Sequence, residues 1–172
     1  DAIEQYQKAL KLYHNISHHR GVGCALGNLG NAYEAIGDII KAIEFHEQGL
    51  VIDRELEDRQ GEANSLNNLG NAHSSLGNRD DAISNFKSSL SIYRSIGDKH
   101  GERIALTNLA DVYIDLEAYS KAIELCNLSL SIATLIGDQP GEGISSLVMG
   151  RAYSRLDDRD LAKTLLEKAE SI

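Results

Sequence analysis

The residues best suited to metal binding are His14 and His18, which lie four positions apart near the end of a helical segment. On a helix this spacing places two imidazoles on one face, as zinc sites require. No third ligand is evident. The alternative is a polar helix end, where His14, His18 and His19 lie favourably near the negative end of the helix dipole. The pattern favours this structural role, and we predict no metal site.

No pattern in the sequence indicates catalysis. No serine, cysteine or threonine occupies a nucleophile elbow or stands beside a recognisable base. Glycines recur at turns and helix crossings rather than in a GxGxxG motif or a phosphate-binding loop. Carboxylates lie mostly at helix starts, where the dipole stabilises negative charge, as at Asp80, Asp81, Asp157 and Asp158. We therefore expect a non-catalytic protein that needs no cofactor.

Asparagine and serine share one face of the segment 59–76, opposite an apolar stripe. The face contains Asn64, Asn67, Asn68, Asn71, Ser74 and Ser75, while Leu66, Leu69, His73 and Leu76 point away. A solvated helix face usually carries charged residues, so the lack of charge indicates another role. An asparagine side chain both donates and accepts hydrogen bonds, so it can pair with the backbone of an extended peptide.

These residues belong to a repeat of forty residues. Residues 61–100 match 21–60 and 101–140 in register, for example at Leu66, Leu69 and Ala82. Two apolar stripes at helical spacing predict a hairpin of helices 59–76 and 79–96, with turns at Gly77-Asn78 and Gly97-Asp98. Residues 1–20 correspond to the second helix of a truncated repeat. Full repeats then occupy 21–60, 61–100 and 101–140, and the last repeat is 141–172.

The pattern Leu66-x-x-Leu69-Gly70-x-x-His73, followed by Ala82, resembles the tetratricopeptide repeat, and the resemblance covers the whole chain. Where His73 departs from the family's usual aromatic residue, the other repeats carry Tyr33, Tyr113 and Tyr153. His73 is therefore expected to pack between helices. The resemblance implies an all-α, right-handed superhelical solenoid of antiparallel helical hairpins. The forty-residue form with Asn-Leu-Gly-Asn is similar to repeats of spindle-orientation adaptors and of many bacterial signalling proteins.

In this family the first helix of each repeat lines the concave surface, so the resemblance implies a groove lined by the amide face. Stacking would align Asn28, Asn68 and Asn108 in one column and Asn31, Asn71, Asp111 and Arg151 in the next. Such columns are similar to the asparagine ladders of O-linked N-acetylglucosamine transferase and the groove asparagines of kinesin light chains, which hold partner backbone. The expected binding residues are Asn28, Asn31, Asn64, Asn67, Asn68, Asn71, Asn108, Asp111, Asp115, Arg151 and Arg155.

Two structural alternatives remain open for these residues. The asparagines can bond to neighbouring helix ends or to one another and set the stacking angle, because an asparagine within a helix lowers helix propensity and needs a reason. Asp111 with Arg151, and Asp115 with Arg155, lie one repeat apart and can pair within the scaffold, which contributes ~0 to 1 kcal/mol. If they are unpaired, Arg151 and Arg155 suit a carboxylate of the ligand.

Composition excludes several other functions. The 172 residues carry a net charge of −9, which argues against a nucleic-acid or anionic-membrane surface. No apolar run approaches the ~18 residues of a membrane span. The two cysteines, Cys24 and Cys126, lie in different repeats and form no disulfide framework, so a reduced, cytoplasmic protein is expected.

The repeat scaffold and its amide face together indicate a binding function. We expect a protein-interaction scaffold that binds a protein or an extended peptide in its concave groove. The alternative is a regulatory or sensor segment of a larger signalling enzyme or transcription regulator. The opening helix has apolar positions without a preceding partner, so the chain is interpreted as a piece of a longer array. Self-association through the end helices, 1–20 or 161–172, is a further expectation.

Overall fold

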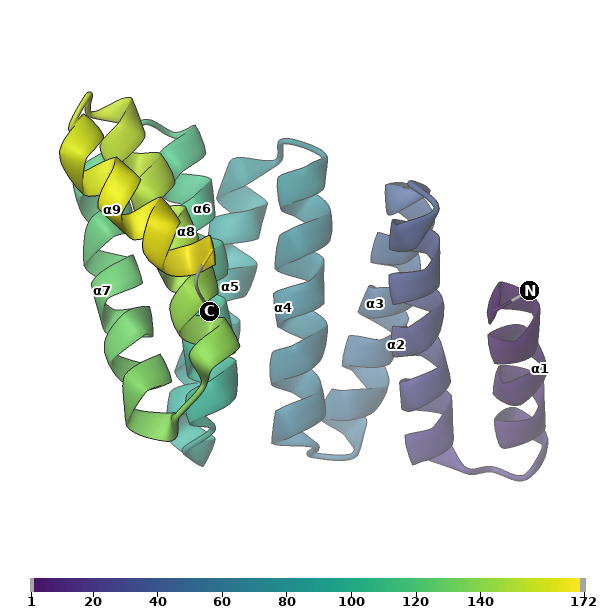
Figure 1. The fold of residues 1–172 in the computed structure, drawn as a ribbon. Helices are drawn as coiled ribbons and strands as arrows, with labels where there is room; N and C mark the ends of the chain where they lie inside the picture. The colour runs from purple at the N-terminus through teal and green to yellow at the C-terminus, as the bar shows by residue number, and fades with distance from the viewer. Residues whose placement is uncertain (1, 171–172) are drawn as a thin grey trace. The chain divides into compact units, whose positions relative to one another are not determined.

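The computed structural model describes residues 2–170, and all the regular secondary structure in this range is α-helical. Consecutive helices are antiparallel and joined by short turns (Figure 1). The helices are α1 (Ala2–Asn15), α2 (His19–Ala35), α3 (Ile39–Glu55), α4 (Arg59–Ser75), α5 (Arg79–Ile96), α6 (Lys99–Asp115), α7 (Tyr119–Ile136), α8 (Gln139–Arg155) and α9 (Arg159–Glu170).

The two helices predicted at 59–76 and 79–96 correspond to α4 and α5 within one residue. Aspartates are the N-cap residues of α4, α6 and α8. Each carboxylate accepts the backbone N–H of a glycine three residues further along the chain. Asp58, Asp98 and Asp138 accept from the backbone of Gly61, Gly101 and Gly141, each at 2.9 Å. Such a cap satisfies a backbone donor that the helix itself cannot.

Every helix connection turns through a residue with positive φ. Four of these residues are glycines, as the repeat pattern predicts, at Gly37, Gly77, Gly97 and Gly137. The other four are not glycines and were not predicted: Ser17, Glu57, Glu117 and Asp157. Since the left-handed conformation crowds a Cβ atom, these four turns carry strain that the glycine turns avoid.

The chain divides into two compact units, Asp1–Ile92 and Tyr93–Ile172, called unit 1 and unit 2 below. In unit 1, α2 packs against α1, α3 and α4, and α3 packs against α4. The core is formed by the predicted apolar positions, among them Leu26, Leu29, Leu66, Leu69 and Phe86. Glycines let the helices approach closely, since a Cβ on Gly70 would lie 2.5 Å from the ring of Phe86.

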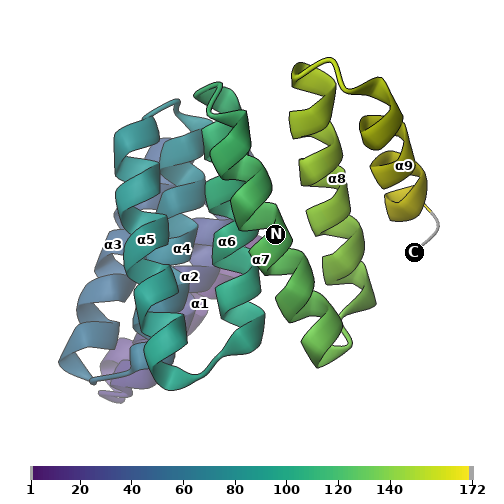
Figure 2. The same cartoon turned by 90° about the vertical axis from the view of Figure 1, so that its left-hand side faces the viewer.

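In unit 2, α6 packs against α7 and α8, α7 packs against α8, and α8 and α9 form the last hairpin (Figure 2). Beside its apolar core runs a chain of buried hydroxyl groups. Ser129 Oγ lies 2.7 Å from Thr107 Oγ1 and 2.8 Å from Ser145 Oγ. Because these hydroxyls satisfy one another, three helices are joined by hydrogen bonds that water does not reach.

Among the helices of residues 2–170, none is both long and apolar enough to cross a membrane.

Candidate functional site

The amide face of unit 1, defined here as Asn28, Asn31, Asn64, Asn68 and Asn71, comes from α2 and α4. Asn28, Asn31 and Asn64 are exposed, and Asn68 and Asn71 are half-buried. Asn68 Nδ2 donates a hydrogen bond to Asn31 Oδ1 at 3.3 Å, at the surface. The structure therefore brings two of the predicted amides from adjacent repeats into contact.

Asn67 was predicted to share this face, but its side chain is buried with only 7% exposed. The reason is a second contact stripe on α4, where Ala63, Asn67 and Gly70 follow one another at helical spacing and are all buried. Ser89 of α5 donates to the carbonyl of Ala63 at 2.8 Å on this side. The small residues Ala63 and Gly70 were the signal in the sequence that this side of the helix is covered.

The corresponding face of unit 2 has a different chemical character. Asn108 and Asp111 on α6 are half-buried, and Asp115, Arg151 and Arg155 are exposed. Arg151 forms an ion pair with Asp111, and both side chains are 47% exposed. The prediction that these two residues can pair within the scaffold is therefore confirmed. Of the two arginines predicted to suit a ligand carboxylate, Arg151 is therefore already paired within the scaffold.

Exposed apolar side chains lie on α8 beside this ion pair. Ile144 and Leu147 are about half exposed, whereas Val148, the third apolar residue of this face, is buried. The accessible face of unit 2 thus combines a charged pair with aliphatic side chains, in contrast to the uncharged amides of unit 1.

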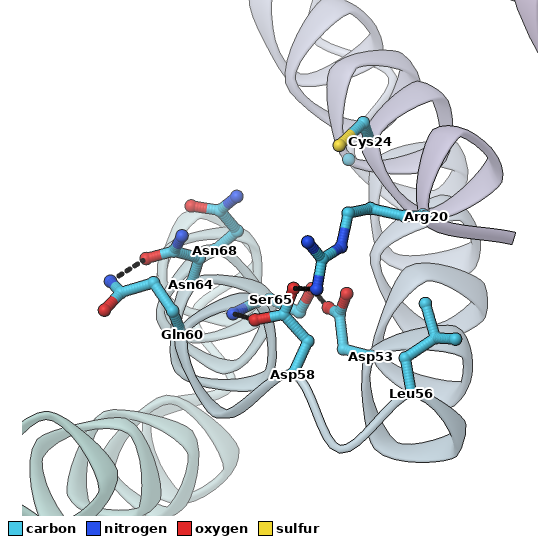
Figure 3. Close-up of a pocket in the computed structure, with 12 residues that line it drawn as sticks. Arg20, Cys24, Asp53, Leu56, Asp58, Gln60, Asn64, Ser65 and Asn68 are labelled. Atoms are coloured by element: carbon cyan, nitrogen blue, oxygen red, sulfur yellow. Dashed lines mark hydrogen bonds and ion pairs between the residues drawn. The ribbon is translucent and has the colours of Figure 1, made fainter. Parts of the chain in front are cut away.

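A hollow of about 350 Å³ opens on unit 1, between the start of α2, the end of α3 and the start of α4 (Figure 3). Asn64 and Asn68 belong both to this hollow and to the amide face. The lining consists of Arg20, Gly23, Cys24, Gly27, Asp53, Leu56, Asp58, Gln60, Gly61, Asn64, Ser65 and Asn68. The predicted amides are therefore continuous with a concave site.

Two carboxylates dominate the electrostatics of this hollow. Asp53 accepts a hydrogen bond from Ser65 Oγ at 2.7 Å and forms no ion pair within residues 2–170. Burial raises the pKa of Asp53, and the neighbouring charges of Asp58 and Glu62 add to the rise, while the bond from Ser65 opposes it. Arg20 lies 3.7 Å from Asp58, but its side chain is 72% exposed (Figure 3). The cation is therefore poorly placed to neutralise both acids.

Arg20, Asp53 and Asp58 were not predicted as residues of a site. One signal was present, because Asp53 stands where the preceding and following repeats carry Tyr13 and Tyr93. A small acid in an aromatic position indicates either a hollow or a buried charge.

The histidines near the first turn have structural roles. Helix α1 ends at Asn15, so His14 and His18 do not share a helical face. His18 caps α2 instead, because its Nδ1 accepts the N–H of Gly21 at 2.8 Å. Within residues 2–170 there is no group of three or more His, Cys, Asp or Glu side chains suited to a metal ion. His73 is partly buried, with Nδ1 3.9 Å from Asp81 Oδ2.

Comparisons with known proteins identify the fold. Among solved structures, BtubC (BKLC) from P. vanneervenii is 19% identical with a TM-score of 0.85, over 99% of this chain and 72% of that one. A Rap protein in complex with the Competence and Sporulation Factor is 20% identical with a TM-score of 0.80, over 97% and 51%. MamA is 26% identical with a TM-score of 0.66, over 98% and 85%. These similarities support an all-α repeat solenoid.

A comparison with curated proteins found no match. The family models are more specific than the structural similarities. A tetratricopeptide repeat model matches residues 1–55 and 101–172, and a second model of the same description matches residues 63–96. Together with the helical hairpins and their forty-residue period, these matches establish that the chain belongs to the tetratricopeptide repeat family.

Proposed function

We propose that this protein is a non-catalytic interaction scaffold that holds a segment of a partner protein against the amide face of unit 1. The observation that carries the proposal is the exposed contact between Asn31 and Asn68, which joins amide side chains from adjacent repeats. Their mutual bond is long for a hydrogen bond and open to solvent. A partner can therefore replace it at little cost.

Amide side chains suit an extended backbone. Each asparagine offers a carbonyl oxygen and an NH₂ group, so successive asparagines can satisfy the N–H and C=O groups of a peptide whatever its side chains are. Specificity must then come from neighbouring sites that recognise side chains. The related fold of the Rap protein was solved in complex with the Competence and Sporulation Factor, which supports binding of another molecule by a scaffold of this kind.

The face of unit 2 is a separate candidate surface and offers a different type of contact. Ile144 and Leu147 offer exposed aliphatic surface, and Arg155 offers an exposed cation. The ion pair between Arg151 and Asp111 is itself exposed, and such pairs contribute ~0 to 1 kcal/mol. A ligand carboxylate can therefore compete for Arg151 without a large loss of scaffold stability.

The test uses peptides selected from a random library on the intact chain. Their affinity is then measured by calorimetry for the wild type and for the double variant Asn31→Ala/Asn68→Ala. The loss of two hydrogen bonds, at about 1 kcal/mol each, should weaken binding by roughly 10- to 30-fold.

The matched control is Asn127→Ala, which removes an exposed asparagine from α7, a second helix of a repeat. This variant should bind the selected peptides as the wild type does. If the double variant binds equally well, the asparagines do not hold the partner and the proposal is wrong.

A further inference from the structure

The hollow at Asp53 has an internal counterpart in unit 2, two repeats further along the chain. Each lining residue of the hollow has an equivalent eighty positions on, so that Gly23 corresponds to Arg103, Asp53 to Ala133 and Asp58 to Asp138. In both places an aspartate caps the first helix of the next repeat through a glycine N–H at 2.9 Å. The two sites therefore share a backbone frame and differ in their side chains.

In unit 2 this place is filled by a guanidinium group. The Arg103 side chain is only 6% exposed, and its Nε lies 2.8 Å from Asp138 Oδ2. A Cβ on Gly141 would lie 2.6 Å from the same Nε, so the guanidinium covers the glycine closely. The N–H of Gly141 lowers the pKa of Asp138 against the effect of burial, and the charges of Arg103 and His100 lower it further. In unit 2 the capping aspartate is thus paired with a buried cation.

In unit 1 the buried guanidinium is missing and a carboxylate is added. Gly23 has no side chain to take the place of Arg103, and Asp53 replaces Ala133. A Cβ on Gly61 would lie 2.6 Å from Asp53 Oδ1, so the added carboxylate covers this glycine instead. The site changes from one acid with a buried guanidinium to two acids with an exposed Arg20.

The other repeat junctions show that the hollow is not a general feature of this fold. Tyr13 packs on Gly21, where a Cβ would lie 2.5 Å from the ring, and Tyr93 packs on Gly101 at 2.3 Å. Both tyrosines occupy the position of Asp53 in their own repeats. The hollow therefore exists because an aspartate replaces the ring that fills the space at the two neighbouring junctions.

We infer that the hollow of unit 1 receives the guanidinium group of an arginine side chain from the bound partner segment, with Asp53 and Asp58 as its acceptors. The inference rests on the proposed function, because Asn64 and Asn68 join the hollow to the amide face (Figure 3). The stem of the arginine would lie along Cys24, Gly27 and Leu56, which offer an apolar wall. A guanidinium is preferred because its planar donors match carboxylates and because Arg103 already shows that it fits this frame.

The experiment titrates the intact chain with N-acetyl-arginine amide and follows backbone amide shifts by NMR. Saturable shifts are expected at Gly23, Gly61 and Ser65, at roughly millimolar concentrations, as befits one charged fragment. The uncharged isostere N-acetyl-citrulline amide should give none. Spermidine tests whether a free polyamine, rather than an arginine side chain, is the better ligand. Stronger binding of spermidine at these residues would overturn the assignment to arginine.

Two variants test the site without removing the fold. Asp53→Asn retains an acceptor for Ser65 and removes the charge, so it should weaken binding of the arginine probe at least ~10-fold. Asp53→Tyr restores the ring found in the adjacent repeats and should abolish binding. Both variants should keep the wild-type circular dichroism spectrum. The control Asp81→Asn changes an exposed acid on α5 and should leave probe binding unchanged.

Absence of saturable shifts in the wild type, or equal binding by Asp53→Asn, would overturn the inference. Neither result bears on the asparagines, because the peptides in the preceding test are selected without regard to arginine. Conversely, the selected peptides could bind the Asn31→Ala/Asn68→Ala variant as tightly as the wild type while the arginine probe still binds at Asp53. That result would refute the proposed backbone contacts and support the arginine site.

Discussion

His46 is a buried residue whose ring nitrogens lack hydrogen-bond partners in the described part of the chain. Its side chain is fully buried, and neither ring nitrogen has a hydrogen-bond partner within residues 2–170. Burial lowers the pKa of His46 to about 4. In the next repeat the same position is Phe86, and both rings pack on a glycine, Gly30 or Gly70. His46 therefore occupies an aromatic position at the expense of two unsatisfied polar atoms.

We predict that His46→Phe stabilises the protein by about 1 to 3 kcal/mol at neutral pH, because a ring of similar shape replaces unsatisfied polar groups. The free energy of unfolding is measured by urea denaturation. The control is Phe86→His, which should destabilise by a similar amount. A loss of stability in His46→Phe would mean that the site does not accept the phenyl ring that its counterpart holds.

The same residue predicts a pH dependence. The unfolded chain takes up a proton on His46 near pH 6.5, whereas the folded chain does so only near pH 4. Acid therefore favours the unfolded state between these values, by roughly 2 kcal/mol at about pH 5 relative to pH 8. His46→Phe should lose this part of the acid sensitivity. Parallel stability profiles for the two proteins between about pH 7 and pH 5 would contradict the prediction.

Neighbouring residues on α4 should respond very differently to truncation. Leu69 is buried at 4% exposed and Asn68 lies half-buried at the amide face. Leu69→Ala should destabilise by roughly 2 to 5 kcal/mol through lost burial and a cavity, and Asn68→Ala by less than about 1 kcal/mol. Urea denaturation separates the two. Comparable losses would assign Asn68 to the structural alternative, in which the asparagines set the stacking of repeats.

At the scale of the helix, the connections differ in the residue that adopts positive φ. Glu117 has φ 58° between α6 and α7, and Gly97 has φ 74° between α5 and α6. Glu117→Gly should raise the free energy of unfolding by up to ~1 kcal/mol, because relief of the left-handed strain exceeds the added flexibility of the unfolded chain. Thermal denaturation measures the effect.

The matched comparison is Gly97→Ala, which should lower stability by about 1 to 2 kcal/mol because it introduces the same strain. Space is available around Gly97, where a Cβ would meet no atom within 4 Å, so the loss would be conformational rather than steric. If both substitutions leave the midpoint unchanged, backbone conformation at the turns does not limit stability.

At the scale of the whole molecule, stability should be shared between neighbouring repeats. Removal of residues 141–172 takes away α8 and α9, which cover one side of α7 and supply Ser145 to the buried hydroxyl chain. We predict a broad unfolding transition whose midpoint falls on this truncation, while helical content per residue stays nearly constant. Circular dichroism during thermal denaturation measures both quantities. A complete loss of helix would show that the chain folds only as one cooperative domain.

The sequence by itself determined the hairpins, the aspartate caps at Asp98 and Asp138 and most of the buried side chains. Helix positions depend on apolar residues three or four apart, and caps depend on an aspartate and a glycine three apart, so a local window contains the necessary information. The forty-residue period predicted the repeat fold, because every period contains the same two apolar stripes and therefore the same helical hairpin. The exposed amides on α2 and α4 followed from the same periodicity.

Only the tertiary structure decided how side chains from different helices fill the spaces between them. The burial of Asn67, the pairing of Arg151 with Asp111 and the hollow at Asp53 depend on residues far apart in the chain. Whether a junction contains a tyrosine ring, a guanidinium or a hollow is set by the combined volume and charge of several helices. Packing density and the need to pair buried charges decide which side chains fit together. A repeat pattern describes one helix at a time, so it does not predict these combinations.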